Sequence, residues 1–586
     1  MKKNQAILLG TDSLSVEGKK IAKALSFFGV PWHALTTAEL LSKTARRESS
    51  SECRLMCSAD TFLQLTEVSE SDPACMQVWQ EQVHSAFVYA GRDPQSFQRL
   101  VRTLIGDNSA VISKNRPGIG DLTVSDRFDD FCGVMSGKRV TANAANTDGN
   151  FVLSTANGNL ISIISRGDGT VFWKLEYKGV PVFLLTSREI VDIDAELKSQ
   201  NFDVRDHFLT AVPLVLYIKW AFAETCWNAP EINACLIIDD PVLKPTHGFV
   251  DFEGLLSLMK QHNFSTNIAF IPWNWRRSAP DVVRLFKNNP EHYSLSVHGS
   301  DHTRAEFGSP SRQRLYWKAQ QALERMNRHE SITGISHDRV MVFPQGIFSE
   351  AAMSALKRTD VIASVNNDII SADPRPRAIT ISDVWDIAVM RYTFPLFTRR
   401  YPWEGIENFA FDALLGKPAI AVIHHEYCSD HCERLVNFVQ QVNALQCPPT
   451  WRNLGEVVRR SCRQKEDSPG AVEVEMYGTE LRIENRFDQS KRFLIRRREC
   501  EPSAIQRICT DAQEVAWKTV EGHINFEIQL NPGENQMVKI RFHDLAGKGF
   551  KGDNRLYRMN AMLRRYLCEV RDNYVTPMRC RFAGSP

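Results

Sequence analysis

Ala234-Cys-Leu-Ile-Ile-Asp239-Asp240-Pro241 is the stretch that decides the fold class of this chain. A short apolar run that stops abruptly is typical of a buried strand in a parallel sheet. Such sheets carry their functional groups at the carboxyl ends of the strands, where this run places two adjacent carboxylates. The stretch therefore predicts a parallel α/β sheet with functional acids at its carboxyl edge.

Two further apolar runs end in histidines. Residues 293–297 lead directly into His298-Gly-Ser-Asp-His302, and residues 419–423 lead into His424-His425. His298 and His302 are four residues apart, so their rings can share one face of a turn. One carboxylate and two neutral imidazoles form a suitable ligand set for a divalent cation. Three strand ends that deliver an acid, metal ligands and a further histidine indicate a catalytic layout.

The composition bounds the class of protein. The 586 residues exceed one ordinary core, so we expect three or four domains, and 43% hydrophobic with 24% charged residues is typical of a globular protein. A net charge of +2 gives no general reason to expect a nucleic-acid partner. We find no apolar run long enough to span a bilayer, and the run at residues 6–10 is shorter than a signal-peptide core. With 14 dispersed cysteines, these features favour a cytoplasmic protein.

The hydrophobic pattern divides the chain into five regions. They are an amino-terminal α/β region of Rossmann or flavodoxin type, with one or two lobes, over 1–205; a helical connector over 206–232; a β/α barrel over 233–463; a small antiparallel β-sandwich over 471–545; and a basic helical tail over 546–586. Residues 464–470 are predicted to be a linker because of their polar composition. The tail is interpreted as a docked helix rather than a nucleic-acid-binding arm.

The motifs of the central region resemble those of NodB-homology polysaccharide deacetylases, carbohydrate esterase family 4. Ile237-Ile-Asp239-Asp240 resembles the first motif, His298-Gly-Ser-Asp-His302 the second and Ile423-His424 the last, in the same order over about residues 230–462. The resemblance implies a deacetylase barrel that removes an N-acetyl, or less favourably an O-acetyl, group from a carbohydrate or glycoconjugate. It leaves the flanking regions without an assignment.

The resemblance also implies a role for each residue. Asp239 is the general base, Asp240, His298 and His302 are the metal ligands, and His424 is the general acid, with His425 as the neighbouring alternative because one position decides which ring faces the cavity. Zn²⁺ is the expected metal, and Co²⁺, Ni²⁺ or Mn²⁺ suit the same ligands.

The chain departs from the family pattern at two places. Pro241 follows the acid pair where glycine is usual, and Val342-Phe-Pro344-Gln-Gly346 lacks the arginine that orients the base in the family. Arg391, or else Arg375 or Arg377, is a candidate replacement from the long loop 373–407. The predicted substrate contacts are Trp273, Trp275, Arg276, Pro344 and Arg391, since loop tryptophans either stack on sugar rings or pack as a lid.

Two other functions stay open. A degenerate barrel that binds saccharide or acts as a scaffold is favoured by the missing arginine. A metal-dependent amidohydrolase acting on a non-sugar amide is favoured by the expected cytoplasmic location. The oligomeric state is left open as well.

Overall fold

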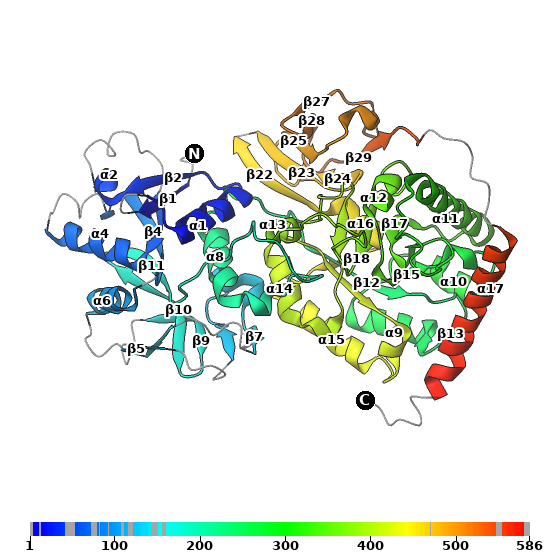
Figure 1. The fold of residues 1–586 in the computed structure, drawn as a ribbon, viewed down its shortest axis with the longest axis horizontal. Coiled ribbons are helices and arrows are strands. Elements are labelled where there is room, and N and C mark those ends of the chain that lie inside the picture. The colour runs from blue at the N-terminus through cyan, green and yellow to red at the C-terminus, as the bar shows by residue number, and fades with distance from the viewer. Residues whose placement is uncertain are drawn as a thin grey trace. The chain divides into compact units, whose positions relative to one another are not determined.

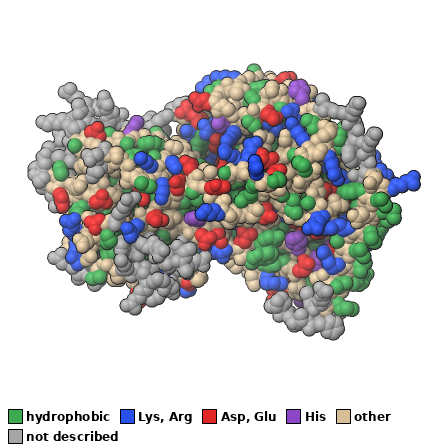
Figure 2. Space-filling model, in the orientation of Figure 1, with side chains coloured by type: hydrophobic (Ala, Val, Ile, Leu, Met, Phe, Trp, Pro, Cys, Tyr) green, Lys and Arg blue, Asp and Glu red, His purple; other side chains and the backbone are tan. Residues whose placement is uncertain are grey.

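The computed structural model describes residues 4–10, 13–41, 53–71, 79–80, 82–91, 93–106, 111–114, 121–141, 151–154, 160–468, 470–511, 513–545 and 554–578 (Figure 1). The chain forms two compact units, which are 1–195 with 203–228 and 445–447, and 196–202 with 229–444 and 448–586. In Figure 2, positive and negative side chains are interspersed over much of the visible face. Among the described residues, no helix is both long and apolar enough to cross a bilayer.

The first unit is built on one mixed sheet of eleven strands. Its parallel part has the order β2 (Trp32–Thr36), β1 (Gln5–Gly10), β3 (Cys53–Ser58), β4 (Val83–Tyr89) and β11 (Val180–Leu185). The antiparallel part continues with β10 (Gly169–Tyr177), β9 (Ile161–Arg166), β6 (Leu122–Val124) and β7 (Arg139–Val140), with β5 (Val111–Lys114) and β8 (Phe151–Ser154) beside it. The parallel and antiparallel parts thus share one sheet.

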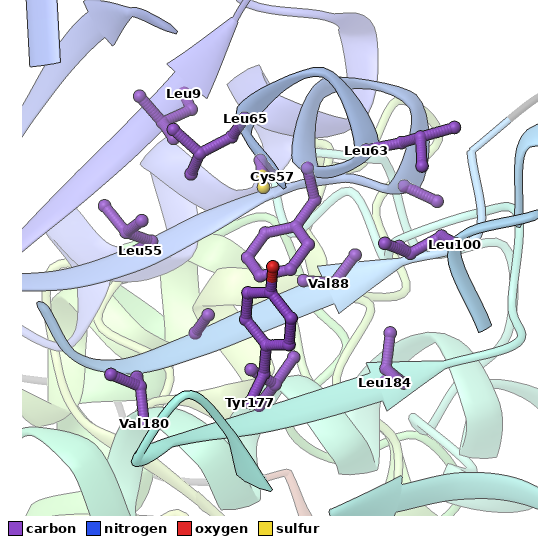
Figure 3. Packing of buried hydrophobic residues seen from close by; sticks show 14 of the residues in the cluster. Leu9, Leu55, Cys57, Leu63, Leu65, Val88, Leu100, Tyr177, Val180 and Leu184 are labelled. Atoms are coloured by element: carbon purple, nitrogen blue, oxygen red, sulfur yellow. The ribbon is translucent and has the colours of Figure 1, made fainter. Parts of the chain in front are cut away.

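Helices bury the parallel strands of this unit. Leucines of α4 (Ala59–Ser71) and α6 (Pro94–Ile105) pack on strand residues such as Leu55 and Val88 (Figure 3). The helix α8 (Phe208–Ala221), predicted as part of a connector, is buried on nearly every side and belongs to this unit. A helix that is apolar on all sides is expected to be buried, as α8 is. Its Tyr217 hydroxyl lies 2.8 Å from the Ser85 hydroxyl of β4, which gives this buried polar group a hydrogen-bond partner.

The second unit contains a nearly closed sheet of parallel strands. The order is β19 (Leu396–Thr398), β18 (Ala363–Asn366), β17 (Asp338–Val342), β16 (Tyr293–His298), β15 (Thr266–Phe270), β12 (Asn233–Asp239) and β20 (Ala419–Ile423), with β21 (Thr450–Trp451) beside β12. Every residue of β12, β15, β16 and β20 is buried, as expected for strands covered on both faces. Arg400 joins the ends of the sheet, because its N–H donates to Ile420 O and its carbonyl accepts from Val422 N, both at 2.9 Å.

Helices alternate with these strands, as the sequence pattern predicts for a β/α barrel. They are α9 (Phe252–His262), α10 (Pro280–Asn288), α11 (Arg312–Thr333), α12 (Glu350–Leu356), α13 (Ile381–Trp385), α14 (Ile406–Leu414), α15 (Glu433–Asn443) and α16 (Leu454–Arg460). All the parallel strands therefore point their carboxyl ends toward one end of the barrel, where loops of different sequence can meet.

Two sheets follow the barrel. One contains β22 (Cys462–Ser468), β23 (Ala471–Met476), β25 (Lys491–Arg498), β28 (His523–Leu530) and β27 (Trp517–Val520), and the other contains β24 (Glu480–Glu484), β29 (Asn535–Phe542) and β26 (Ile505–Cys509). Residues of both sheets share one apolar core. The sequence predicted an antiparallel β-sandwich preceded by a linker, and both parts need correction. Strand β23 runs parallel to β25, and most of the expected linker 464–470 is strand β22. The polar sequence of β22 fits its place at the sheet edge, where charged side chains are common.

A buried ionic cluster connects the barrel with these sheets. The Lys357 ammonium, at the end of α12, is hydrogen-bonded to the Glu499 carboxylate, which also accepts a bond of 2.9 Å from Arg497 Nη1. All three side chains are fully buried, at 0% exposure. Arg497 Nε further donates to the carbonyls of Tyr477 and Gly478, each at 3.1 Å. The cluster therefore couples barrel and sheets through charges that water does not reach.

The last described segment is the helix α17 (Arg555–Val570), which continues into a π-helical turn at Arg571–Val575. Its position in sequence agrees with the predicted helical tail. The tail residues 546–553 and 579–586 lie outside the described residues. Hydrogen bonds such as that between Tyr557 and Asp301 hold α17 against the barrel.

Candidate functional site

The two acids of the first motif have different partners. Asp239 is the last residue of β12, and Asp240 takes a φ of +80°, a conformation that non-glycine residues rarely adopt. The Asp239 carboxylate bonds to an arginine, whereas Asp240 lies beside two histidines. The backbone turn thus separates two adjacent carboxylates into two environments.

Asp240, His298 and His302 bring three ligand atoms together. Asp240 Oδ1 lies 3.5 Å from His298 Nε2 and 3.1 Å from His302 Nε2, and the three ligand atoms lie within 4.8 Å of one another. Oδ1 is buried and accepts no hydrogen bond from the described residues. A buried carboxylate oxygen that faces two imidazole nitrogens fits a divalent cation bound by one acid and two histidines.

A backbone carbonyl orients the ring of His298, whereas His302 is held through its backbone and its ring Nδ1 lies 3.4 Å from Arg565 Nη2. His298 Nδ1 lies 3.0 Å from the carbonyl oxygen of Val342 on β17, which assigns the proton to Nδ1 and leaves Nε2 free as a ligand. The loop from Gly299 to His302 is held by the carboxylate of Glu306, which accepts hydrogen bonds of 3.0 Å from the backbone N–H groups of Ser300, Asp301 and His302. The ligand positions are therefore fixed before any cation binds.

The charges of this site favour a cation. Burial lowers the pKa of His302 to about 4, so its ring is neutral at pH 7 and free to act as a ligand. Burial also opposes protonation of His298, yet the carboxylates of Asp239 and Asp240 outweigh it and raise the pKa of that ring. Burial opposes ionisation of Asp240, but His302 and His298 hold its pKa well below its usual range. The negative charge of Asp239 and Asp240, which favours a proton on His298, would equally attract a metal ion.

Arg399 binds Asp239 in a bidentate pair. Its Nη1 and Nη2 donate to the two carboxylate oxygens, each at 2.7 Å, and its Nε donates to Asn367 Oδ1 at 2.8 Å. Both side chains of the pair are almost completely buried. Burial alone would raise the pKa of Asp239, but the guanidinium charge, with His298 beside it, keeps the pKa below its ordinary value. Asp239 is thus a buried carboxylate held in one orientation.

The structure distinguishes the two late histidines by position. His424 follows β20, lines the same cavity as Asp239 and stacks on Tyr401 at a centroid distance of 6.4 Å. His425 is buried behind it, stacked on Phe249 at 6.0 Å, and a Cβ on Gly248 would lie 2.3 Å from its Nδ1. His424 is therefore the ring that faces the cavity.

The cavity has a volume of about 1640 Å³ and is closed on one side by α17 and the turn that follows it. Arg565 Nη2 donates to the His302 carbonyl at 3.3 Å, and Asp572 Oδ1 lies 3.5 Å from His425 Nε2. Glu569 forms ion pairs with Lys244 and Arg277 of the barrel. A helix from the far end of the sequence thus forms one wall of the site.

The remaining predicted site residues lie elsewhere. Trp273, Trp275 and Arg276 do not line the cavity; the Trp273 ring packs edge-on against Tyr566 at 6.1 Å, and Arg276 lies over Trp275. Pro344 supports the ligand loop, since a Cβ on Gly299 would lie 2.4 Å from Pro344 Cγ.

Arg391 is exposed and also absent from the lining of the cavity, so it does not replace the family arginine. Arg377 pairs with Glu350 instead, and Arg375 is exposed. Arg399 bonds to the first acid, and sequence reasoning missed it because β19 has only three residues inside a segment assigned as loop. The available signal was an arginine that follows the short run Leu396-Phe397-Thr398.

An aromatic platform at the cavity was also missed. The Tyr401 and Trp403 rings are stacked at 4.2 Å, Tyr427 lies 5.8 Å from Trp403, and all three line the cavity. Trp403 is 61% exposed, which is unusual for tryptophan and suits contact with a ring of a ligand. These residues follow β19 and β20, so they belong to the loops at the carboxyl ends of the strands.

Comparison with known proteins gives only distant similarity. No family model and no curated protein matches the chain. Among solved structures, a Mycobacterium smegmatis protein assigned as a polysaccharide deacetylase has 13% identity and a TM-score of 0.28, with 39% of this chain and 90% of that chain covered. A family 4 carbohydrate esterase from Streptomyces lividans has 10% identity and a TM-score of 0.24, with 38% and 92% covered. A CE4 esterase from Streptococcus mutans has 14% identity and a TM-score of 0.23, with 36% and 82% covered.

Proposed function

We propose that the second unit is a metal-dependent hydrolase that removes an acetyl group, preferably from an amide nitrogen, of a carbohydrate or glycoconjugate. The observation that carries the proposal is the arrangement at one cavity of an arginine-bound carboxylate, Asp239, a ligand set of Asp240, His298 and His302, and a second imidazole, His424. Each belongs to the end of a barrel strand or the loop behind it. The same groups are those that hydrolysis of an amide requires.

The ligand set would hold the cation, and Zn²⁺ suits one carboxylate and two neutral imidazoles best. A bound divalent ion supplies two effects, because it lowers the pKa of water to about 7 and polarises a carbonyl group.

Asp239 accepts the proton of the attacking water, and Arg399 keeps its carboxylate ionised and aimed. His424 donates a proton to the departing nitrogen. Trp403, at the mouth of the cavity, offers a face on which a sugar ring stacks.

Metal content tests the ligand set directly. Wild-type protein is expected to bind about one equivalent of Zn²⁺ per chain, and His298→Ala is expected to lose most of it, because removing one of three protein ligands weakens a tetrahedral site strongly. His292→Ala is the matched control, since His292 directly precedes the first residue of the same strand. Metal analysis after dialysis with Zn²⁺, together with acetate release from N-acetylated oligosaccharides, provides the readout. A wild-type chain that binds no metal would refute the proposal.

Arg399→Lys is expected to lower kcat for acetate release by about 10²-fold without changing metal content. Lysine keeps the charge but cannot form the bidentate pair that aims Asp239. Arg391→Lys, at the exposed arginine predicted from the sequence, serves as the control and should keep full activity. An Arg399→Lys enzyme as active as wild type would show that the pair has only a structural role.

A further inference from the structure

Helix α17 presents two unlike faces. Its inner face is docked on the barrel: the Tyr557 hydroxyl donates to Asp301 Oδ2 at 3.1 Å, Ala561 and Arg565 are buried, and Asn573 Oδ1 accepts from Gly248 N at 2.8 Å. Tyr557, Ala561 and Arg565 are spaced four residues apart, as on one side of a helix, and Asn573 lies in the turn that follows. The helix is therefore held in place, and its outer face has a defined direction.

The outer face is apolar along its whole length. Ten of the 17 exposed large hydrophobic side chains among the described residues belong to this one segment. They are Leu556, Met559, Met562, Leu563, Tyr566, Leu567, Val570, Tyr574, Val575 and Met578. Figure 2 shows hydrophobic side chains along the edge that α17 forms in Figure 1. An apolar stripe of this length on a soluble protein marks an interaction surface.

Acidic and basic side chains of α17 and the following turn lie on different faces. The acids between residues 554 and 578 are Glu569 and Asp572, and both face the barrel, with side-chain exposures of 11% and 5%. The exposed charged side chains of the segment are arginines: Arg555, Arg558 and Arg571, of which Arg571 is 58% exposed and pairs with Asp572 at 2.6 Å. The outer surface thus combines apolar side chains with positive charge only.

We propose that the outer face of α17 binds a membrane surface that contains anionic phospholipid. A helix lying in the interface plane inserts its apolar face to the depth of the headgroups and first methylenes, while arginines reach the phosphates. Two tyrosines on the stripe suit the same depth. The positive charge complements an anionic bilayer.

The same charges oppose pairing of this face with a second copy. Two such helices would bring Arg555 and Arg558 of both chains onto the shared surface, with no exposed acid of the segment to compensate. A helix pair that excludes water between two chains usually carries both signs of charge along its flanks. The charge pattern therefore favours lipid as the occupant.

Vesicle co-sedimentation with the full-length protein tests the proposal. We expect wild-type protein to bind phosphatidylcholine vesicles that contain about 30% phosphatidylglycerol, and to bind pure phosphatidylcholine at least about tenfold more weakly. The combined variant Leu556→Ser, Met559→Ser, Leu563→Ser and Leu567→Ser should lose binding by about tenfold or more. Arg555→Gln with Arg558→Gln should lose most of the preference for anionic vesicles.

Matched controls separate this surface from general hydrophobicity. Ile332→Ser with Val520→Ser changes two exposed apolar residues elsewhere in the same unit and should leave vesicle binding unchanged. Thermal unfolding shows whether each variant is folded, and binding is measured without substrate, so the result does not depend on the proposed reaction. Equal vesicle binding by the four-serine variant and wild type would overturn the proposal. A wild-type dimer that the same variant dissociates, with no vesicle binding, would overturn it in favour of self-association.

Discussion

Asp239→Asn is expected to lower kcat for acetate release by about 10²- to 10⁴-fold while the protein still binds about one equivalent of metal. The amide of asparagine fills the same volume but cannot take a proton from water. The ligand set contains Asp240, not Asp239, so metal content should not change. The measurement is acetate release under single-turnover conditions, with metal analysis of the same sample.

Glu426→Gln is the matched control for this result, because Glu426 also lines the cavity and is not bonded to Arg399 or close to the ligand atoms. It should lose less than about tenfold. Full acetate release by Asp239→Asn protein would remove the base from the proposed reaction. Loss of acetate release together with loss of metal would assign Asp239 to the metal site instead.

Glu499→Gln is expected to lower the free energy of unfolding of the second unit by about 3–5 kcal/mol. The change leaves two fully buried cations, Lys357 and Arg497, without their shared carboxylate. Glu501→Gln is the control, since Glu501 is 40% exposed, pairs with Arg358 at 3.2 Å and lies at 3.9 Å from Lys357, and it should cost less than about 1 kcal/mol. Urea unfolding followed by the fluorescence of the barrel tryptophans measures both.

The same cluster gives a pH dependence with a definite sign. Burial opposes ionisation of Glu499, but Arg497 and Lys357 outweigh it and lower the pKa of the carboxyl. A carboxyl with a lowered folded-state pKa stabilises the protein above its unfolded value of about 4.3, and this contribution is lost as pH falls toward the folded value. Wild type should therefore lose stability below about pH 4.3 more steeply than Glu499→Gln. Parallel acid-unfolding curves for the two proteins would contradict this account.

The strands that carry the ligands were predictable because each is a local pattern. An apolar run bounded by acids or histidines identified β12 and β20, and residues 293–297 correspond to β16 with His298 as its last residue. Each signal spans fewer than about ten residues and needs no knowledge of the rest of the chain. The candidate metal ligands come together because strand ends in a parallel sheet meet at one edge.

Other parts of the site depend on contacts that no local pattern encodes. A strand of three residues, β19, gives too short a periodic signal to place Arg399. The spacing of residues 555–571 predicted a helix, but not that Arg565 would contact His302, 263 residues earlier in the chain. The polar edge strand β22 resembled a linker because its stabilisation comes from pairing with β23 rather than from burial.

The contribution of α17 to the cavity has a consequence at the level of the gene. A stop codon introduced just after codon 545 would leave every proposed metal ligand in the product but remove Arg565, which contacts the carbonyl and the Nδ1 of His302. The product would also lack Glu569 and Asp572, which together with Arg565 form one wall of the cavity. Metal content and acetate release of such a truncated protein would show whether the capacity to hold the ion survives without the enclosure in which a substrate is held.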